Sequence, residues 1–333
     1  MSLRVLPEAQ WRADAAAHRA RLDELVGPYL ERRAAGSSHP VIDFLFTYYG
    51  HKPAQLRRWH PGYGVALAGA AEYEGARGYH RVALPGDLDA NPSTVEPGAD
   101  HDSPAGDRDS ASGPGAFTAD PAYLARRRET IEFIVTLLRA TASRPAQLSC
   151  FGLHEWAMVY RTDDVRHQQV PLRLGRAGTD EVVESMSLRC THYDAFRFFT
   201  PDAVGRNIEP LTRADQVSRE QPGCLHANMD LYKWGFATTP LIRSELLLDC
   251  FELAYSAREL DMRASPYDLS RYGYDPVRIE TPSGRAEYVR RQSEIAERAC
   301  TLRARLLEAC LELLARAPDV RQPAPGRPAR STS

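Results

Sequence analysis

Four segments of the chain repeat apolar residues at intervals of three and four, which is the spacing of one face of an α-helix. They span residues 8–34, 121–142, 240–263 and 284–316. Each such stripe must be buried against another element, so we expect packed helices at both ends of the chain. The last segment carries the longest row, formed by Tyr288, Ile295, Ala299, Leu302, Leu306, Cys310 and Leu313.

Two of these helices carry signals for where they begin or break. Thr239 is suited to cap the helix of residues 240–263, with Pro240 at its first position. Pro28 is expected to interrupt the helix of residues 8–34, because proline lacks the backbone N–H that the helix needs.

The middle of the chain, residues 146–200, favours strands. Apolar side chains alternate there at period two along residues 182–192, which is typical of a strand with one buried face. Residues 63–84 are punctuated by glycine and suit a hairpin or loops. The predicted fold class is therefore α+β, a single domain over residues 1–316. In it a small, mostly antiparallel sheet is flanked by N-terminal helices and a long C-terminal helix.

Two segments lack the large apolar residues that a core needs. Residues 86–120 are rich in Gly, Pro, Asp and Ser, and we expect a disordered insert there. The tail of residues 317–333 has a similar composition and is also expected to be disordered.

Composition limits the function classes. The formal net charge is −2, so the chain as a whole has no attraction for nucleic acid or an anionic membrane. It contains no run of 18 apolar residues and no apolar leader near its start, which predicts a cytoplasmic protein with no membrane partner. The six cysteines are far apart, and we expect free thiols.

The segment 221–236 gathers polar and aromatic side chains within sixteen residues. On a helix, His226 and Asp230 share one face, and so do Asp230 and Trp234. On a strand, every second residue from 226 to 234 would line one face. The trio could orient an imidazole, supply a carboxylate and offer a stacking surface, whereas the alternative is a buried, hydrogen-bonded turn. The other candidates for contact with a ligand here are Asn228, Tyr232 and Lys233.

Two further clusters lie upstream. His154, Glu155 and Trp156 form one, for which a hydrogen-bonded core histidine is the alternative interpretation. The other places Asp194 beside Tyr193 and Phe196, where a carboxylate could face a cationic ligand. Its alternative is an edge strand with Asp194 exposed.

Cysteine and histidine recur as two C-x-H units, which could supply four tetrahedral ligands to zinc or another transition metal. The alternative is two core cysteines with histidines bonded to the backbone. The four residues are Cys190, His192, Cys224 and His226.

Basic residues surround an aromatic one in HKPAQLRRWHPG at 51–62. Lys52, Arg57 and Arg58 near Trp59 would suit a phosphate and a stacked base. A solvated amphipathic turn is the alternative.

Several segments resemble an actinobacterial family whose members carry the name 3-methyladenine DNA glycosylase. They include HPVIDFLFTYYGHKPAQLRRWHPG, CFGLHEWAMVYRT, RCTHYDAFRFFTPDA and QPGCLHANMDLYKW. The resemblance implies a base-excision DNA-repair hydrolase, which cleaves the N-glycosidic bond of alkylated purines such as 3-methyladenine. Duplex DNA with a damaged base would then be the partner.

That chemistry needs an aromatic pocket for the flipped base and a carboxylate near the sugar. Asp194 or Asp230 could supply the carboxylate, and Tyr193, Phe196, Tyr232 and Trp234 the rings.

Two other classes stay open at this point. One is a metal- or haem-dependent enzyme acting on a small acidic or aromatic substrate, with His154, His192 and His226 as ligands or acid–base groups. The other is a non-catalytic ligand-binding module. In every case we expect residues 150–160, 190–199 and 224–234 to meet in one pocket. A homodimer through the C-terminal helix is a further prediction.

Overall fold

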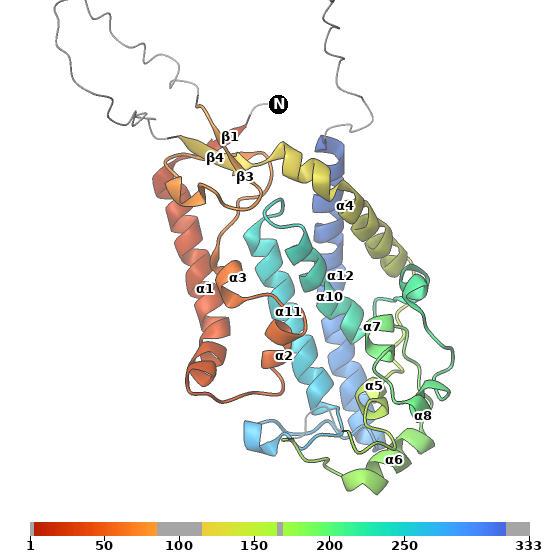
Figure 1. The fold of residues 1–333 in the computed structure, drawn as a ribbon. Helices are drawn as coiled ribbons and strands as arrows, with labels where there is room; N and C mark the ends of the chain where they lie inside the picture. The colour runs from red at the N-terminus through yellow and green to blue at the C-terminus, as the bar shows by residue number, and fades with distance from the viewer. Residues whose placement is uncertain (1–2, 85–114, 165–168, 318–333) are drawn as a thin grey trace, which may run out of the picture.

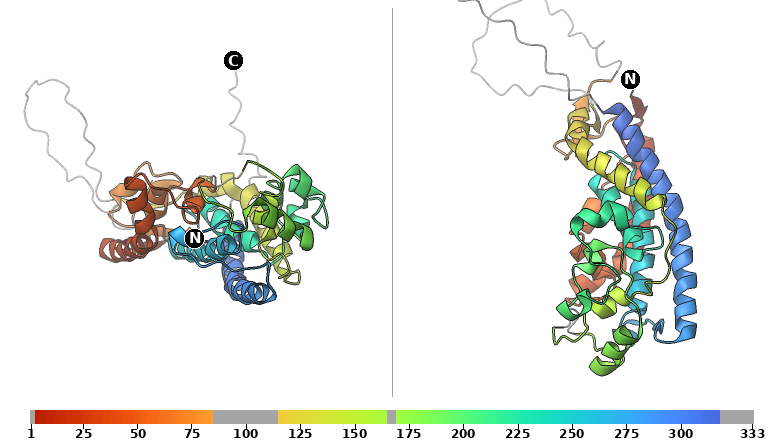
Figure 2. Two further views of the ribbon diagram at one scale, coloured as in Figure 1. Left: turned by 90° about the horizontal axis from the view of Figure 1, so that it is seen from below. Right: turned by 90° about the vertical axis from the view of Figure 1, so that its right-hand side faces the viewer.

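A computed structural model describes residues 3–84, 115–164 and 169–317 of the chain. It is mainly helical and carries one small mixed sheet, which confirms the α+β class. The long helices run side by side along the molecule, and the sheet lies at one end of them (Figures 1 and 2). These helices are α1 (Glu8–Ala34), α4 (Pro121–Ala142), α10 (Leu225–Ala237), α11 (Ser244–Arg263) and α12 (Pro282–Arg316).

Short helices connect the long ones. Near the N-terminus these are α2 (Asp43–Thr47) and α3 (Pro53–Arg57). Those between α4 and α10 lie between the middle of the molecule and the end opposite the sheet (Figure 1). They are α5 (Leu153–Ala157), α6 (Gly175–Ser185), α7 (Tyr193–Phe196), α8 (Pro201–Val204) and α9 (Gln216–Arg219).

The sheet has the strand order β1-β2-β4-β3. Its strands are β1 (Arg4–Leu6), β2 (Val65–Leu67), β3 (Tyr79–Val82) and β4 (Ala116–Ala119). β1 pairs in parallel with β2, whereas β4 pairs antiparallel with both β2 and β3. The expectation of a mostly antiparallel sheet is therefore confirmed, and residues 63–84 supply two of its strands.

The strands predicted for residues 146–200 are wrong. Most of that region is helical or irregular, with α5, α6 and α7 in it. The alternation along 182–192 has a mixed origin. Val182 and Val183 lie on the buried side of α6, and the chain becomes extended from Met186 onward. That extended stretch makes only an isolated bridge, from Leu188 to Asn207, so period two persists there without a sheet.

Two helix ends differ from the prediction. The helix expected at Pro240 begins at Ser244, and Arg243 rather than Thr239 precedes it. Ser244 is held there by a hydrogen bond from the backbone N–H of His60 to its Oγ, at 2.8 Å. Helix α1 continues through Pro28 to Ala34, so the proline does not interrupt it.

The expected disordered insert is too long at its C-terminal end. Residues 116–119 form the buried strand β4, and Asp120 caps α4 by accepting a hydrogen bond from the backbone of Ala122. Residues 85–114 and the tail of residues 318–333 lie outside the described residues.

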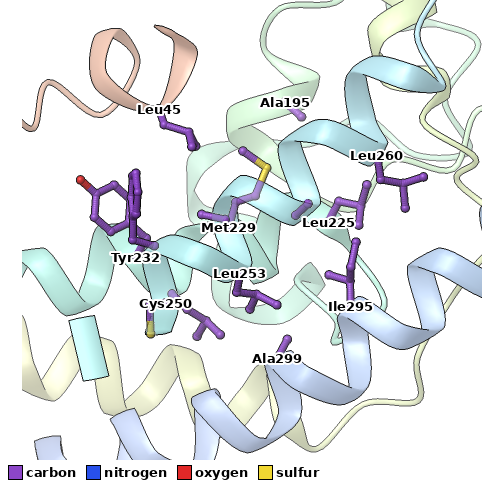
Figure 3. Packing of buried hydrophobic residues seen from close by; sticks show 14 of the residues in the cluster. Leu45, Ala195, Leu225, Met229, Tyr232, Cys250, Leu253, Leu260, Ile295 and Ala299 are labelled. Carbon is purple, nitrogen blue, oxygen red and sulfur yellow. The ribbon is translucent and has the colours of Figure 1, made fainter. Parts of the chain in front are cut away.

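The main core lies where α10, α11 and α12 pack together (Figure 3). Met229 of α10, Leu253 of α11 and Ile295 of α12 are buried there. A smaller core, which includes Trp11 and Trp59, lies under the sheet. The apolar stripe of α12 is thus buried within its own chain, and the homodimer stays a prediction. In the described part of the chain, no helix is long and apolar enough to cross a membrane.

Candidate metal centre

Three histidines from separate segments meet inside the helical end of the molecule. His154 belongs to α5, His192 directly precedes α7, and His226 lies in the first turn of α10. The ring centroids of His154 and His226 are 4.5 Å apart, and those of His192 and His226 are 5.3 Å apart. All three side chains are buried. The three segments that we expected to meet in one pocket do come together, around a cavity of about 10 Å³.

The backbone explains how a one-turn helix places His154. Phe151 and Gly152 both have positive φ, of 52° and 71°, which turns the chain sharply into α5. A Cβ on Gly152 would lie 3.3 Å from the Cβ of Ala264, so the turn packs closely against the end of α11. Glycine suits this position because it adopts positive φ without strain.

The first half of the site is an ion-pair network. His154 Nε2 lies 2.7 Å from Asp261 Oδ1, and His154 Nδ1 lies 3.6 Å from the sulfur of Cys150. Arg258 Nη1 donates to Asp261 Oδ2 at 3.0 Å and to Glu155 Oε1 at 2.8 Å. Burial alone would lower the pKa of His154, but Asp261 outweighs it and raises that pKa well above the usual range. These groups thus pair with one another, although Arg258 Nε has no hydrogen-bond partner among the described residues.

His226 lies between the two halves and behaves differently. Burial, with the neighbouring His154 and His192, holds its pKa well below the usual range, so its imidazole is neutral. Its donor atom also lies near those of His154 and Asp261, and these three form a first group that could hold an ion. Because His154 and Asp261 already share a short hydrogen bond, an ion there would have to displace it.

The second half of the site surrounds His192 with two carboxylates. His192 Nε2 lies 3.4 Å from Glu220 Oε1 and 3.4 Å from Asp230 Oδ2. Among the described residues, neither ring nitrogen of His192 has a hydrogen-bond partner, although the side chain is only 1% exposed. Burial would lower the pKa of His192, but Glu220 and Asp230 raise it, so Nε2 is satisfied either by charge pairing with these carboxylates or by an ion bound between the three groups.

The spacing of these donors fits a metal ion. Bonds of about 2.0–2.1 Å in a tetrahedral site place neighbouring donor atoms about 3.3–3.4 Å apart. Both distances from His192 have this value, and the donor atoms of His192, Glu220 and Asp230 converge as one group. Three protein ligands leave a fourth position for water or substrate, as in catalytic zinc sites. We call these three residues the His192 triad.

Further residues hold the carboxylates of the triad in place. The hydroxyl of Tyr49 donates to Asp230 Oδ1 at 2.9 Å, and Gln216 Nε2 donates to Glu220 Oε1 at 2.7 Å. Burial alone would raise the pKa of Asp230, but the charges of Lys233 and His192 and the hydroxyl of Tyr49 lower it far below its usual range. Such support is what metal ligands need to keep their orientation.

The zinc quartet predicted from the two C-x-H units is wrong in its thiols. Cys190 Sγ donates to the carbonyl oxygen of His192 at 3.5 Å, while His192 Nε2 faces the carboxylates. Burial raises the pKa of both Cys190 and Cys224, and among the described residues neither thiol belongs to a group of converging donor atoms. These cysteines, with Cys150, line a cavity of about 10 Å³, which is about the size of one water and too small for a haem.

Asp194 lies at the edge of the site in a cluster of positive charges. It is 8% exposed, so the exposed edge-strand alternative is wrong. Lys233 Nζ lies 3.1 Å from Asp194 and 3.3 Å from Asp230, so it joins this cluster to the triad. Arg197 and Arg213 also pair with Asp194, at 3.1 and 3.4 Å.

Several predicted ligand-contacting residues serve the core instead. Trp156 is fully buried and donates to the carbonyl of Ala264 at 2.8 Å. Asn228 accepts from Arg303 at 2.6 Å and is also fully buried. Tyr232 is buried among rings because α10 is a helix, so it does not share the face of His226 and Asp230. Phe196 is buried and packs against Phe199.

The remaining predicted residues lie nearer the surface. Trp234 is half-buried against Phe133, with Lys233 Nζ 4.7 Å from its ring centroid. Tyr193 is half-buried, with the guanidinium of Arg213 over its ring. Lys52, Arg57 and Arg58 lie at α3, which packs on α1, and Arg57 pairs with Asp23.

Sequence reasoning missed Glu220, Asp261, Arg258 and Tyr49. Asp261 had a usable signal, because it continues the buried row of Cys250, Ala254 and Ala257 at helical spacing. A charged residue in an apolar stripe is expected to have a buried partner. Glu220 lies in a short irregular segment and carries no such signal.

Comparison with protein-family models, with curated proteins and with solved structures finds no match.

Proposed function

We propose that this protein is a metal-dependent enzyme whose divalent ion is held by the His192 triad. The observation that carries the proposal is the buried imidazole of His192, which lacks a hydrogen-bond partner among the described residues and lies 3.4 Å from two carboxylates. One imidazole and two carboxylates form a donor set of nitrogen and oxygen, which suits zinc, manganese or iron.

The charge of the site supports a small acidic substrate. A divalent ion supplies a Lewis acid and activates a bound water, so hydrolysis is the reaction class proposed. Three cations form ion pairs with Asp194 beside the triad, namely Lys233, Arg197 and Arg213. With Asp194 and Asp230 as their counter-ions, these cations can orient an anionic group of the substrate near the ion.

The metal content of variants tests the proposal. The protein is purified without an affinity tag that binds metal, incubated with Zn²⁺, Mn²⁺ or Fe²⁺ and desalted, and bound metal is measured by mass spectrometry. We expect about one ion per chain in the native protein. Since loss of a ligand removes one metal bond, Glu220→Gln and His192→Gln should lower metal affinity by at least about 10-fold.

Glu184→Gln is the matched control, because Glu184 is exposed and pairs with Arg161 outside the triad. It should bind as much metal as the native chain. Circular dichroism verifies that each variant is folded. Equal metal content in all three variants, or no metal in folded native protein, would contradict the proposal.

A DNA N-glycosylase is the second candidate, and one observation favours it. Asp230 is an ionised, buried carboxylate that accepts a hydrogen bond from Tyr49, whose ring contacts that of Tyr232, and base excision requires a carboxylate near aromatic rings. Release of 3-methyladenine from methylated duplex DNA tests it. Activity that survives chelation and is lost in Asp230→Asn would favour the glycosylase over the metal enzyme, and no release would exclude it.

A further inference from the structure

A second cavity, of about 420 Å³, lies between α3, the start of α4 and the end of α10. Its volume is in the range of small-molecule sites. It is distinct from the triad: its lining includes Phe236, six residues beyond Asp230 on α10, but no member of the triad.

The lining of this cavity is strongly basic. Arg58, Arg77 and Arg127 contribute three guanidinium groups, and of the residues that the structure describes no aspartate or glutamate lines it. Within the described ranges, none of the three forms an ion pair with a carboxylate. His60 also lines the cavity but is neutral, since burial lowers its pKa to about 3.

Arg127 is held in a fixed position within this lining. One of its terminal nitrogens donates to the carbonyl oxygen of Ala237, at the end of α10. Its Nε is buried and has no hydrogen-bond partner in the part of the chain that the structure describes. Because this anchor fixes the guanidinium of Arg127 at the wall of the cavity, its other terminal nitrogen can meet an anion there at little cost in side-chain entropy.

Aromatic rings complete the lining. Tyr123 lies beneath the guanidinium of Arg77, 5.9 Å from its ring centroid, and donates to the carbonyl of Thr239 at 3.2 Å. Phe236 is half-buried and stacks on His51 with centroids 3.6 Å apart. A ring-bearing ligand could contact these apolar surfaces while its anion meets the arginines.

From this arrangement we infer that the cavity is a binding site for a small phosphomonoester that carries a flat ring, with the phosphate held by Arg58, Arg77 and Arg127. Three guanidinium groups without carboxylates match the two negative charges of a phosphomonoester better than the single charge of a carboxylate. Bidentate hydrogen bonds from arginine favour the same group.

Isothermal titration of the full chain with AMP, with adenosine and with inorganic phosphate tests the inference. We expect AMP to bind, adenosine to bind at least 10-fold more weakly, and inorganic phosphate to compete with AMP. Arg58→Met and Arg127→Met should each lower the affinity for AMP by about 10-fold or more, because each removes a charge-assisted hydrogen bond to the phosphate.

The control is Arg126→Met on the same helix. Arg126 also lies against the ring of Tyr123, at 5.7 Å, but it pairs with Asp120 and does not line the cavity. Its AMP affinity should stay within two-fold of the native value. Arg127→Met also removes the hydrogen bond to Ala237, which costs stability. Arg58 is exposed, so Arg58→Met should fold like the native chain and tests the site independently.

Three outcomes would overturn the inference. These are no AMP binding at millimolar concentration, equal binding of AMP and adenosine, and an equal loss of affinity in Arg126→Met and Arg58→Met. The last would mean that the local positive potential of this surface, and not the cavity itself, attracts the nucleotide. A short DNA duplex that binds more tightly than AMP and loses affinity in Arg58→Met would also contradict the small-molecule assignment.

Discussion

Arg258 provides a test of how the polar core is stabilised. Its side chain is 1% exposed and donates to both Glu155 and Asp261. Its guanidinium carbon also lies 4.0 Å from the ring centroid of Phe44. Arg258→Met keeps much of the length and apolar contact of the side chain but removes its charge, so Glu155 would be left buried without its cation.

The expected magnitude follows from these contacts. Removing one partner of a buried ion pair costs about 3–5 kcal/mol of unfolding free energy. Two charge-assisted hydrogen bonds, at about 1.5–3 kcal/mol each, give the same range. At about 2 °C per kcal/mol for a chain of this size, the melting temperature should fall by roughly 6–10 °C.

A double-mutant cycle separates lost charge pairing from lost packing. Urea unfolding is followed by circular dichroism for Arg258→Met, for Glu155→Gln and for the double variant. Because glutamine carries no charge, the double variant should be more stable than Arg258→Met alone by about 1–2 kcal/mol.

Arg128→Met is the surface control for this cycle. Arg128 pairs with Glu132 one helical turn away, and both side chains are substantially exposed, so the change should cost less than about 0.5 kcal/mol. The reasoning fails if Arg258→Met costs no more than this control. It also fails if the two changes of the cycle are simply additive.

Two further predictions concern the backbone and pH. A Cβ at position 284 would lie 1.9 Å from the carbonyl oxygen of Arg278, so Gly284→Ala should lower the unfolding free energy by about 3 kcal/mol. By contrast, Gly27 lies in α1 with no described atom within 4 Å of its Cβ position, so Gly27→Ala should raise the free energy of unfolding by about 0.5–1 kcal/mol. Urea unfolding of both variants tests this, since the two changes in stability should have opposite signs, and equal changes would refute the reasoning. Burial lowers the pKa of His60 from 6.5 to about 3, so between these values the unfolded chain binds a proton that the folded chain does not. Stability is therefore lost as pH falls below about 6.5, and from pH 7 to 5 this histidine should cost about 2 kcal/mol. His60→Asn keeps a polar atom near Tyr79 but cannot take up this proton, so its stability should fall by about 2 kcal/mol less than that of the native chain between pH 7 and 5. An equal dependence of stability on pH in the two proteins would contradict the assignment.

The long helices could be predicted from sequence because their apolar stripes are regular. Residues 121–142 and 284–316 match α4 and α12 to within two residues at each end. The sheet could not be placed, since its strands are three or four residues long and pair across distant segments. Period two over such short stretches also arises in extended chain outside a sheet, as the buried Leu188 and Cys190 show.

The site was predictable only in part, for a related reason. His154, His192 and His226 were recognised because each belongs to a compact polar and aromatic motif. The choice of ligands was wrong because it depended on sequence spacing, whereas Glu220 and Asp230 reach His192 from two separate segments of the folded chain. Only packing determines that His192 Nε2 faces carboxylates and not the thiols of Cys190 and Cys224.

X-ray absorption spectroscopy on protein loaded with one equivalent of Zn²⁺ tests the metal centre most directly. The His192 triad predicts nitrogen and oxygen donors at about 2.0–2.1 Å, with the outer-shell scattering of a single imidazole. A sulfur shell at about 2.3 Å would show instead that cysteine thiols bind the ion, and two imidazoles would place it beside His154 and His226. Either result would contradict the assignment of His192, Glu220 and Asp230 as ligands.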